Sequence, residues 1–125
     1  MVQFILYVAD QAISTAFYSA VLDKQPVLNV PGMTEFLLAD NVKLGLMPET
    51  GIAKILADKT PHPSQGSGIP RCELYLYVDD IEASYRRLHD ANALEISPVQ
   101  DCDWGDKVCY FRDPDGHIIA MALKG

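Results

Sequence analysis

The chain has 125 residues, 49% hydrophobic and 22% charged, so it supports one folded domain and is not a disordered segment. Its formal net charge of −7 repels phosphate backbones and anionic lipids, so neither nucleic acid nor a membrane is expected as a partner. Three cysteines without a CxxC motif fit free, mostly buried thiols in a reducing compartment, which predicts a cytoplasmic location.

The first half of the chain predicts a strand, a helix and three further strands. Residues 4–9 are rich in β-branched and aromatic side chains and precede Asp10, a residue type suited to cap a helix. Apolar side chains then recur at three- and four-residue spacing, which predicts an amphipathic helix. Its apolar positions are Ile13, Ala16, Phe17, Ala20 and Val21. Extended segments follow near 25–30, at 36–38 and at 42–47, the last two flanking an Asp40-Asn41 turn.

Residues 48–71 form a linker in which 51–56 can be helical and 60–70 read as flexible, because Pro, Gly and Ser dominate there. Beyond it, Leu74-Tyr75-Leu76-Tyr77-Val78-Asp79-Asp80 repeats the first strand at an offset of 77 − 7 = 70 residues. Identical pairs at this offset are Leu6/Leu76, Val8/Val78, Asp10/Asp80 and Ser14/Ser84. Internal repeats of this kind indicate architecture before any motif does.

The second copy predicts the same order of elements. Its helix has an apolar face of Ile81, Ser84, Tyr85 and Leu88, and Asp79 with Glu82 is expected to form a capping box. Strands follow at 94–99, 108–111 and 117–122, the last two joined by the hairpin turn Asp113-Pro114-Asp115-Gly116. The predicted fold class is therefore α+β, with two βαβββ modules, residues 1–47 and 72–125, in a single domain.

This duplication resembles the vicinal oxygen chelate superfamily, which has the glyoxalase/bleomycin resistance/extradiol dioxygenase fold. The resemblance covers essentially the whole chain and rests on two motifs within the duplication: Phe17-Tyr18 on the first helix, and Tyr110-Phe111-Arg112-Asp113-Pro114-Asp115-Gly116-His117 before the last strand. It implies two modules whose curved mixed sheets form a cup for a small organic ligand, in many members across a homodimer.

The resemblance also implies four metal-ligand positions, on the first and last strands of each module, which fall on Gln3, Gly45, Glu73 and Ala120. A metal site of this type needs about three imidazole or carboxylate ligands. Glu73 can donate, Gln3 only weakly, and the other two positions have no donor. We therefore expect no metal and no other cofactor. The family chemistries that use the metal as a Lewis acid are correspondingly disfavoured.

Strand alternation extends this set to a predicted cup lining, because residues of equal parity share a face. The lining is Gln3, Ile5, Tyr7, Lys43, Gly45, Met47, Glu73, Tyr75, Tyr77, Ile118, Ala120 and Ala122. Residues of the other parity, such as Phe4, Leu6 and Val8, are expected to pack against the helices. The predicted ligand-binding residues are Gln3, Tyr7, Lys43, Met47, Glu73, Tyr75, Tyr77 and Trp104.

Several of these residues have more than one interpretation. Lys43 and Glu73 are a possible ion pair. The tyrosines either orient a ligand or only cover the core of a half-buried sheet. Trp104, in a polar loop, stacks on a planar ligand, plugs its module or makes a dimer contact. Cys72 and Cys109 are expected to be buried and inert, and His117 to have a structural or surface role.

Three functions are consistent with these features. The leading hypothesis is a metal-independent protein that binds and sequesters a small molecule, similar to the bleomycin-resistance branch and its role in antibiotic resistance. The alternative is a glyoxalase-like lyase or dioxygenase-type metalloenzyme with an altered metal site, in which Glu73 serves as base or ligand. The third is a structural or regulatory dimer whose cup is vestigial. A homodimer is expected in each case, because association covers unpaired edge strands.

Overall fold

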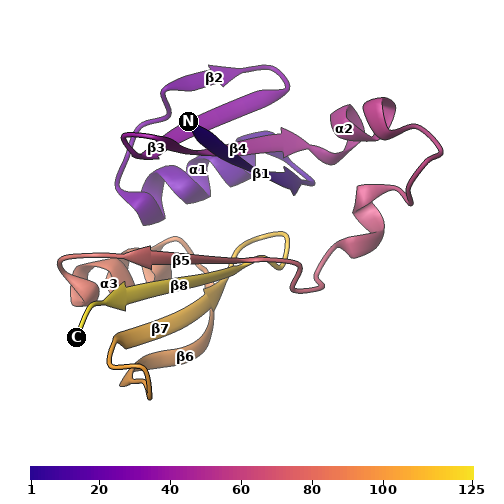
Figure 1. Ribbon diagram of the computed structural model, residues 1–125. Helices are drawn as coiled ribbons and strands as arrows, with labels where there is room; N and C mark the ends of the chain where they lie inside the picture. Colours follow the sequence, from indigo (N-terminus) through magenta and orange to yellow (C-terminus); the bar gives the residue numbers. More distant parts are fainter. The chain divides into compact units, whose positions relative to one another are not determined.

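The first half of the chain folds as the predicted βαβββ module (Figure 1). In the computed structural model, which describes residues 1–125, β1 (Val2–Val8), α1 (Gln11–Leu22), β2 (Leu28–Val30), β3 (Met33–Ala39) and β4 (Val42–Pro48) follow one another. The sheet order is β1-β4-β3-β2, with β1 parallel to β4 and the other pairs antiparallel. The chain then forms α2 (Glu49–Leu56) and a short 3₁₀ turn, Pro63–Gly66.

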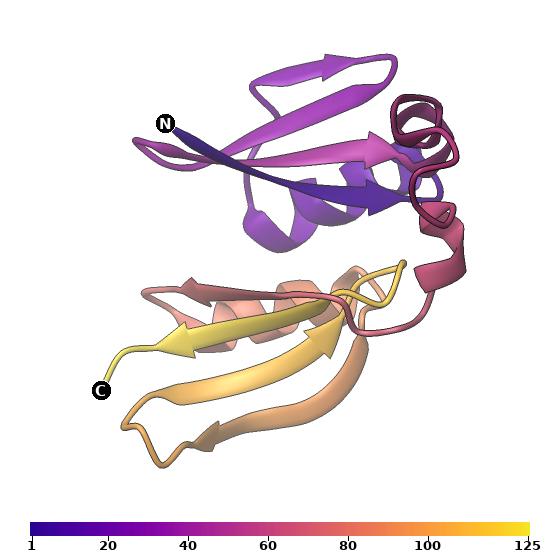
Figure 2. The same cartoon turned by 45° about the vertical axis from the view of Figure 1, so that its right-hand side comes forward.

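The second half repeats this arrangement, which confirms the duplication and the α+β class. Its elements are β5 (Glu73–Tyr77), α3 (Ile81–Asp90), β6 (Leu94–Asp101), β7 (Lys107–Arg112) and β8 (Ile118–Leu123). The sheet order is β5-β8-β7-β6, again with one parallel pair. The N-terminal compact unit contains Met1–Ser19 and Asp23–Ser67, and the C-terminal unit contains Gly68–Gly125 together with Ala20–Leu22 from the end of α1. In each unit the helix lies along one face of its sheet (Figure 2).

The helix-facing side of the N-terminal sheet is its core. The hydroxyls of Thr15 on α1 and Thr34 on β3 lie 2.8 Å apart, so α1 covers the face that also contains Phe36, Leu44 and Leu46. These side chains are fully buried, as is Val8. Phe4 shares their parity but is 58% exposed, so its predicted packing against the helix is wrong. It lies near the start of β1, an edge strand with a neighbour on one side only.

The C-terminal core follows the same rule, and α3 buries Ile81, Ser84 and Leu88 against its sheet. The helix is capped by Asp80, whose carboxylate accepts the backbone N–H of Ala83 at 3.1 Å, and not by the predicted Asp79. Asp80 has the extended backbone that an N-cap residue needs, and its short carboxylate reaches the first turn from there.

The predicted hairpin turn is present and is stabilised by its own side chains. The Asp113 carboxylate accepts the backbone N–H groups of Asp115 (2.8 Å) and His117 (2.9 Å), and its second oxygen lies 2.8 Å from His117 Nδ1. Both partners are buried, so His117 has the expected structural role. Cys109 is buried as predicted, whereas Cys72 is exposed, because it precedes β5 in the connecting segment. No helix of the chain is both long and apolar enough to cross a membrane.

Candidate functional site

The face of the N-terminal sheet opposite α1, which we call the N-terminal open face, carries the predicted residues of the first module. In the parallel β1–β4 pair, Gln3 is in register with Lys43, Ile5 with Gly45, and Tyr7 with Met47. Residues in register on neighbouring strands point to the same side. The structure therefore brings these six residues together on one face.

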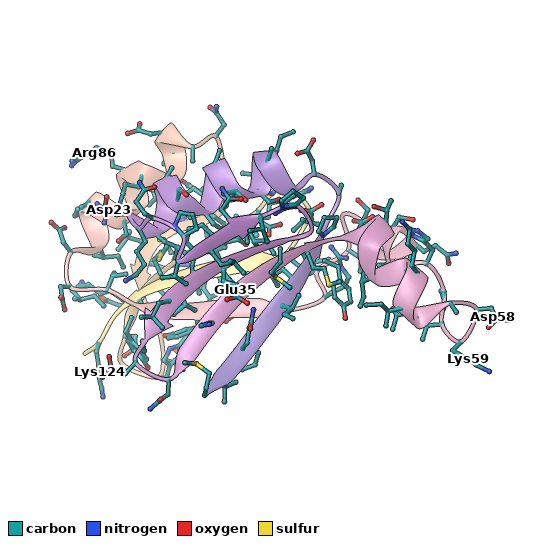
Figure 3. All side chains as sticks on the ribbon, turned by 90° about the horizontal axis from the view of Figure 1, so that it is seen from above. Asp23, Glu35, Asp58, Lys59, Arg86 and Lys124 are labelled. Atoms are coloured by element: carbon teal, nitrogen blue, oxygen red, sulfur yellow. The ribbon has the colours of Figure 1, made fainter.

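A carboxylate that the sequence analysis missed organises this face. Glu35 on β3 accepts a hydrogen bond from Gln3 Nε2 at 2.8 Å and an ion-paired hydrogen bond from Lys43 Nζ at 3.1 Å. The hydrogen bonds from Gln3 and Lys43 hold the pKa of Glu35 below its usual value. Figure 3 shows Glu35 on the face of this sheet. Lys43, for which Glu73 was considered as a possible partner, forms its ion pair with Glu35 in its own unit.

Gln3 and Gly45, the two metal-ligand positions that the family resemblance implies for this module, lie next to each other, with the Gln3 side chain over Gly45. A Cβ added to Gly45 would lie 2.6 Å from Gln3 Nε2, 3.2 Å from Ile5 Cγ1 and 3.3 Å from the Met33 sulfur. Gly45 itself has no donor atom, and the Gln3 amide nitrogen is already bonded to Glu35. The two metal-ligand positions of this module therefore do not fit a metal ion.

The face of the C-terminal sheet opposite α3, which we call the C-terminal open face, is aromatic and apolar. Tyr75 and Tyr110 flank Ala120 in one row across three strands, and Tyr77 and Val108 flank Ala122 in the next. Val108 and the two alanines are fully buried, and Tyr75, Tyr110 and Cys102 pack against them. Large side chains on the outer strands thus flank an apolar floor of small ones.

A chain of hydrogen bonds joins the exposed tryptophan to this floor. Trp104 Nε1–H donates to the Tyr75 hydroxyl at 2.8 Å, and that hydroxyl donates to Asp106 at 2.7 Å. Burial and the bond to Asp106 raise the pKa of Tyr75 to about 12, and the Tyr75 hydroxyl lowers the pKa of Asp106. Asp106 is buried and also accepts the backbone N–H of Gly125 at 3.3 Å. Tyr75 therefore positions Trp104 and is not a free acid.

The aromatic rings themselves remain accessible. Trp104 is 59% exposed and Tyr77 is 60% exposed. The rings of Tyr75 and Tyr77 lie 5.4 Å apart, edge to face, and Lys124 Nζ lies 5.9 Å from the Tyr77 ring centre. Exposed aromatic surface of this extent favours contact with a ligand, since large aromatic side chains gain most from burial.

The two metal-ligand positions of the C-terminal module also lack a set of donor atoms suited to a metal ion. Glu73 is exposed at the start of β5 and has no ion-pair or hydrogen-bond partner, while Ala120 has no donor. The one cluster of potential ligands, Asp113, Asp115 and His117, has ligand atoms within 4.8 Å of one another. The Asp113 carboxylate of this cluster already accepts three hydrogen bonds within the turn. We therefore assign this cluster to the hairpin.

A groove of about 540 Å³ lies elsewhere, on the helix side of the N-terminal unit. It is lined by Gln11, Ala12, Thr15, Ala16, Asn29, Val30 and Pro31, none of which the sequence analysis predicted. Gln11 closes its base by donating to Val30 O at 2.8 Å and Thr34 Oγ1 at 3.0 Å. These bonds tie α1 to the β2–β3 hairpin, which is a structural role.

Comparison with known proteins gives one consistent result. The family model described as "Glyoxalase-like domain" matches residues 1–123. An uncharacterized protein of Bacillus subtilis, YraH, is 28% identical over 97% of this chain and 95% of its own length. An uncharacterized protein of Mycobacterium tuberculosis, Rv0887c, is 27% identical over 90% of this chain and 67% of its own.

Solved structures share the fold. A glyoxalase-related enzyme from Fulvimarina pelagi superposes with a TM-score of 0.82 at 20% identity, over 99% of this chain and 87% of that protein. A lactoylglutathione lyase from Agrobacterium tumefaciens gives 0.72 at 23% identity, over 98% of this chain and 92% of that one. At these identities the likeness shows the architecture alone.

Proposed function

Because the chain belongs to the glyoxalase-like domain family but lacks a donor set at that family's metal positions, we propose that it binds a small organic molecule without a metal there. The observation that carries this proposal is the C-terminal open face. Its exposed Trp104 is fixed by the Tyr75 hydroxyl, and the exposed ring of Tyr77 lies beside Tyr75. A mostly apolar surface with a few fixed polar groups is what small-molecule binding requires.

The N-terminal open face supports the same proposal with polar chemistry. Lys43 uses one ammonium proton on Glu35 and keeps two further donors, and the Gln3 carbonyl oxygen remains an acceptor. Tyr7 and Met47 lie next to this cluster in register. Such a face orients a ligand through directed hydrogen bonds, while the C-terminal open face supplies apolar contact.

The test uses N-phenyl-1-naphthylamine, a neutral aromatic dye that fluoresces when it leaves water. We expect saturable binding by protein whose metal content, measured by plasma mass spectrometry, is negligible, and no change after treatment with EDTA. Trp104→Ala should weaken binding about tenfold, because a lost aromatic contact is worth roughly 1.5 kcal/mol or more. Ile55→Ala, which removes a 72% exposed apolar side chain from α2, is the matched control.

Two results would contradict the proposal. Binding that appears only after Zn, Ni, Mn, Fe or Co is added would mean that the metal positions have been assigned wrongly. Equal losses in Trp104→Ala and Ile55→Ala would mean that the dye adheres to any exposed apolar side chain.

One observation favours a second candidate, an enzyme that uses Glu73. Its carboxylate is exposed on the C-terminal open face, two strands from Tyr110, and its charge adds to burial in raising the pKa of that tyrosine. An exposed carboxylate on a ligand face can act as a general base. Lactoylglutathione lyase activity that disappears in Glu73→Gln would establish this function, and activity that survives the substitution would exclude it.

A further inference from the structure

Arg112 occupies an unusual position on the C-terminal open face. It lies at the end of β7, in register with Ile118 on β8 and Leu94 on β6, so both cross-strand neighbours are aliphatic. Its side chain is half-buried and has no hydrogen bond and no ion pair anywhere in the structure. Its guanidinium nitrogens reach solvent, so all of their donors are available to an anion from outside the chain.

Several other cations of the two sheets and their connecting segment have partners. Lys43 lies 3.1 Å from Glu35, Lys107 lies 3.0 Å from Asp101, and Arg71 donates to the Ile69 and Asp115 carbonyls at 3.0 and 2.7 Å. Arg112 differs from these three cations because it has neither an ion pair nor a hydrogen bond.

The nearest acidic residues do not serve Arg112. Asp113 follows it directly, but its carboxylate is taken by the turn and by His117. Glu73 lies in the same cross-strand row, two strands away beyond Ile118. The two backbones are about 10 Å apart at the ordinary strand spacing, and no ion pair joins the two side chains. The guanidinium is thus left for an anion from outside the chain.

We propose that Arg112 binds the oxyanion of an aromatic organic acid, a carboxylate or sulfonate, whose ring lies against the tyrosines and Trp104. The guanidinium presents planar paired donors that match such a group. Tyr110 lies two residues before Arg112 on the same face, about 7 Å along the strand, a distance that a ring and its anionic substituent can span. This inference rests on the proposed function and specifies its ligand class.

The net negative charge of the chain makes the expected effect of Arg112 easy to distinguish from general electrostatic attraction. A net charge of −7 disfavours anions in general, so any preference for an acidic ligand must come from a local contact. Removing Arg112 should abolish that preference, whereas removing another positive charge should not.

The experiment compares two dyes that differ in one group. 8-Anilinonaphthalene-1-sulfonate has the ring system of N-phenyl-1-naphthylamine plus a sulfonate. Trp104 is the only tryptophan, so energy transfer from it reports dye bound near the C-terminal open face. Arg112→Gln should weaken binding of the sulfonate dye at least about tenfold, the loss of one charge-assisted contact, and leave the neutral dye within about twofold. Arg86→Gln, at an exposed position of α3 (Figure 3), should change neither.

Each outcome decides between the two proposals. Unchanged binding of the sulfonate dye by Arg112→Gln overturns the role of Arg112, and the neutral dye still tests the proposed function. A loss of both dyes in Arg112→Gln also overturns it, because the side chain would then support the fold and not the anion. If the unmodified protein binds neither dye, the proposed function itself fails.

Discussion

The hairpin turn at residues 113–116 allows a sharp test of how the fold is held together. Gly116 has φ +96°, and a Cβ added to it would lie 2.7 Å from Gly68 Cα and 2.8 Å from its carbonyl carbon. Gly68 is held there because its N–H donates to Asp115 O at 3.0 Å, and Arg71 donates to the same oxygen at 2.7 Å. The perturbation is Gly116→Ala, and neither backbone can yield without losing these bonds.

The magnitude follows from two separable costs. A side chain at such a φ is strained by about 1–3 kcal/mol wherever it occurs. The backbone clash adds a further 1–3 kcal/mol, roughly the cost of overpacking a filled site. Gly32 isolates the first cost, because its φ is +94° and an added Cβ meets nothing within 4 Å. For a chain of this length, about 4 °C of melting temperature corresponds to 1 kcal/mol.

The assay is thermal unfolding of Gly116→Ala and Gly32→Ala, followed by circular dichroism. We expect both variants to melt below the unmodified protein, and Gly116→Ala to melt roughly 4–12 °C below Gly32→Ala. Equal melting temperatures would refute the reasoning, since they would show that the contact between the turn and Gly68 contributes nothing.

Two further predictions concern titration and thiol reactivity. An absorbance titration should show a late step near pH 12, about two units above an ordinary tyrosine, to which Tyr75 and Tyr85 both contribute, and Tyr75→Phe should remove about half of its amplitude. The pKa of Tyr75 is higher in the folded than in the unfolded protein. The bond to Asp106 therefore stabilises the fold fully below about pH 10, and this contribution is lost as pH rises through about 12. A single step near pH 10 for all tyrosines would contradict this prediction. The exposed thiol of Cys72 should react with Ellman's reagent at pH 8 in the folded protein. Burial raises the pKa of Cys109 to about 11, so its thiol should react only when the protein unfolds. The reverse order of reaction would show that the two thiols are placed wrongly.

The fold was accessible from the sequence because the information lies in periodicity and repetition. Strand alternation and helical spacing depend on local chain geometry, so the order of elements in both modules follows from them. The predictions were wrong at positions whose environment depends on a neighbouring strand or on the local backbone. Phe4 has helix-facing parity, but its exposure depends on which strand is the sheet edge. Asp79 and Asp80 are both good caps by type, and only the backbone at the helix start selects Asp80.

The site was accessible only in part, for the same physical reason. Parity placed Gln3, Lys43 and Tyr75 on the correct faces, because register and alternation fix the direction of a side chain. The partners of those residues were missed. Glu35 precedes the strand predicted at 36–38, and Asp106 lies in a loop whose path alternation does not describe. Hydrogen-bond partners far apart in sequence depend on tertiary geometry that periodicity does not contain.

The two copies share residues that serve the fold and differ on their open faces. The identical pairs serve the fold in both modules: Asp10 and Asp80 each accept a backbone N–H of their helix, and Ser14 and Ser84 are both buried. The open faces have diverged at equivalent rows. In the N-terminal unit the row is Ile5, Gly45 and Glu35.

In the C-terminal unit the equivalent row is Tyr75, Ala120 and Tyr110. A carboxylate beside a glycine on one face corresponds to tyrosines on both sides of an alanine on the other. The exposed Trp104, held by Tyr75, and the unpaired Arg112 both belong to the C-terminal open face, and the proposed aromatic acid would contact both.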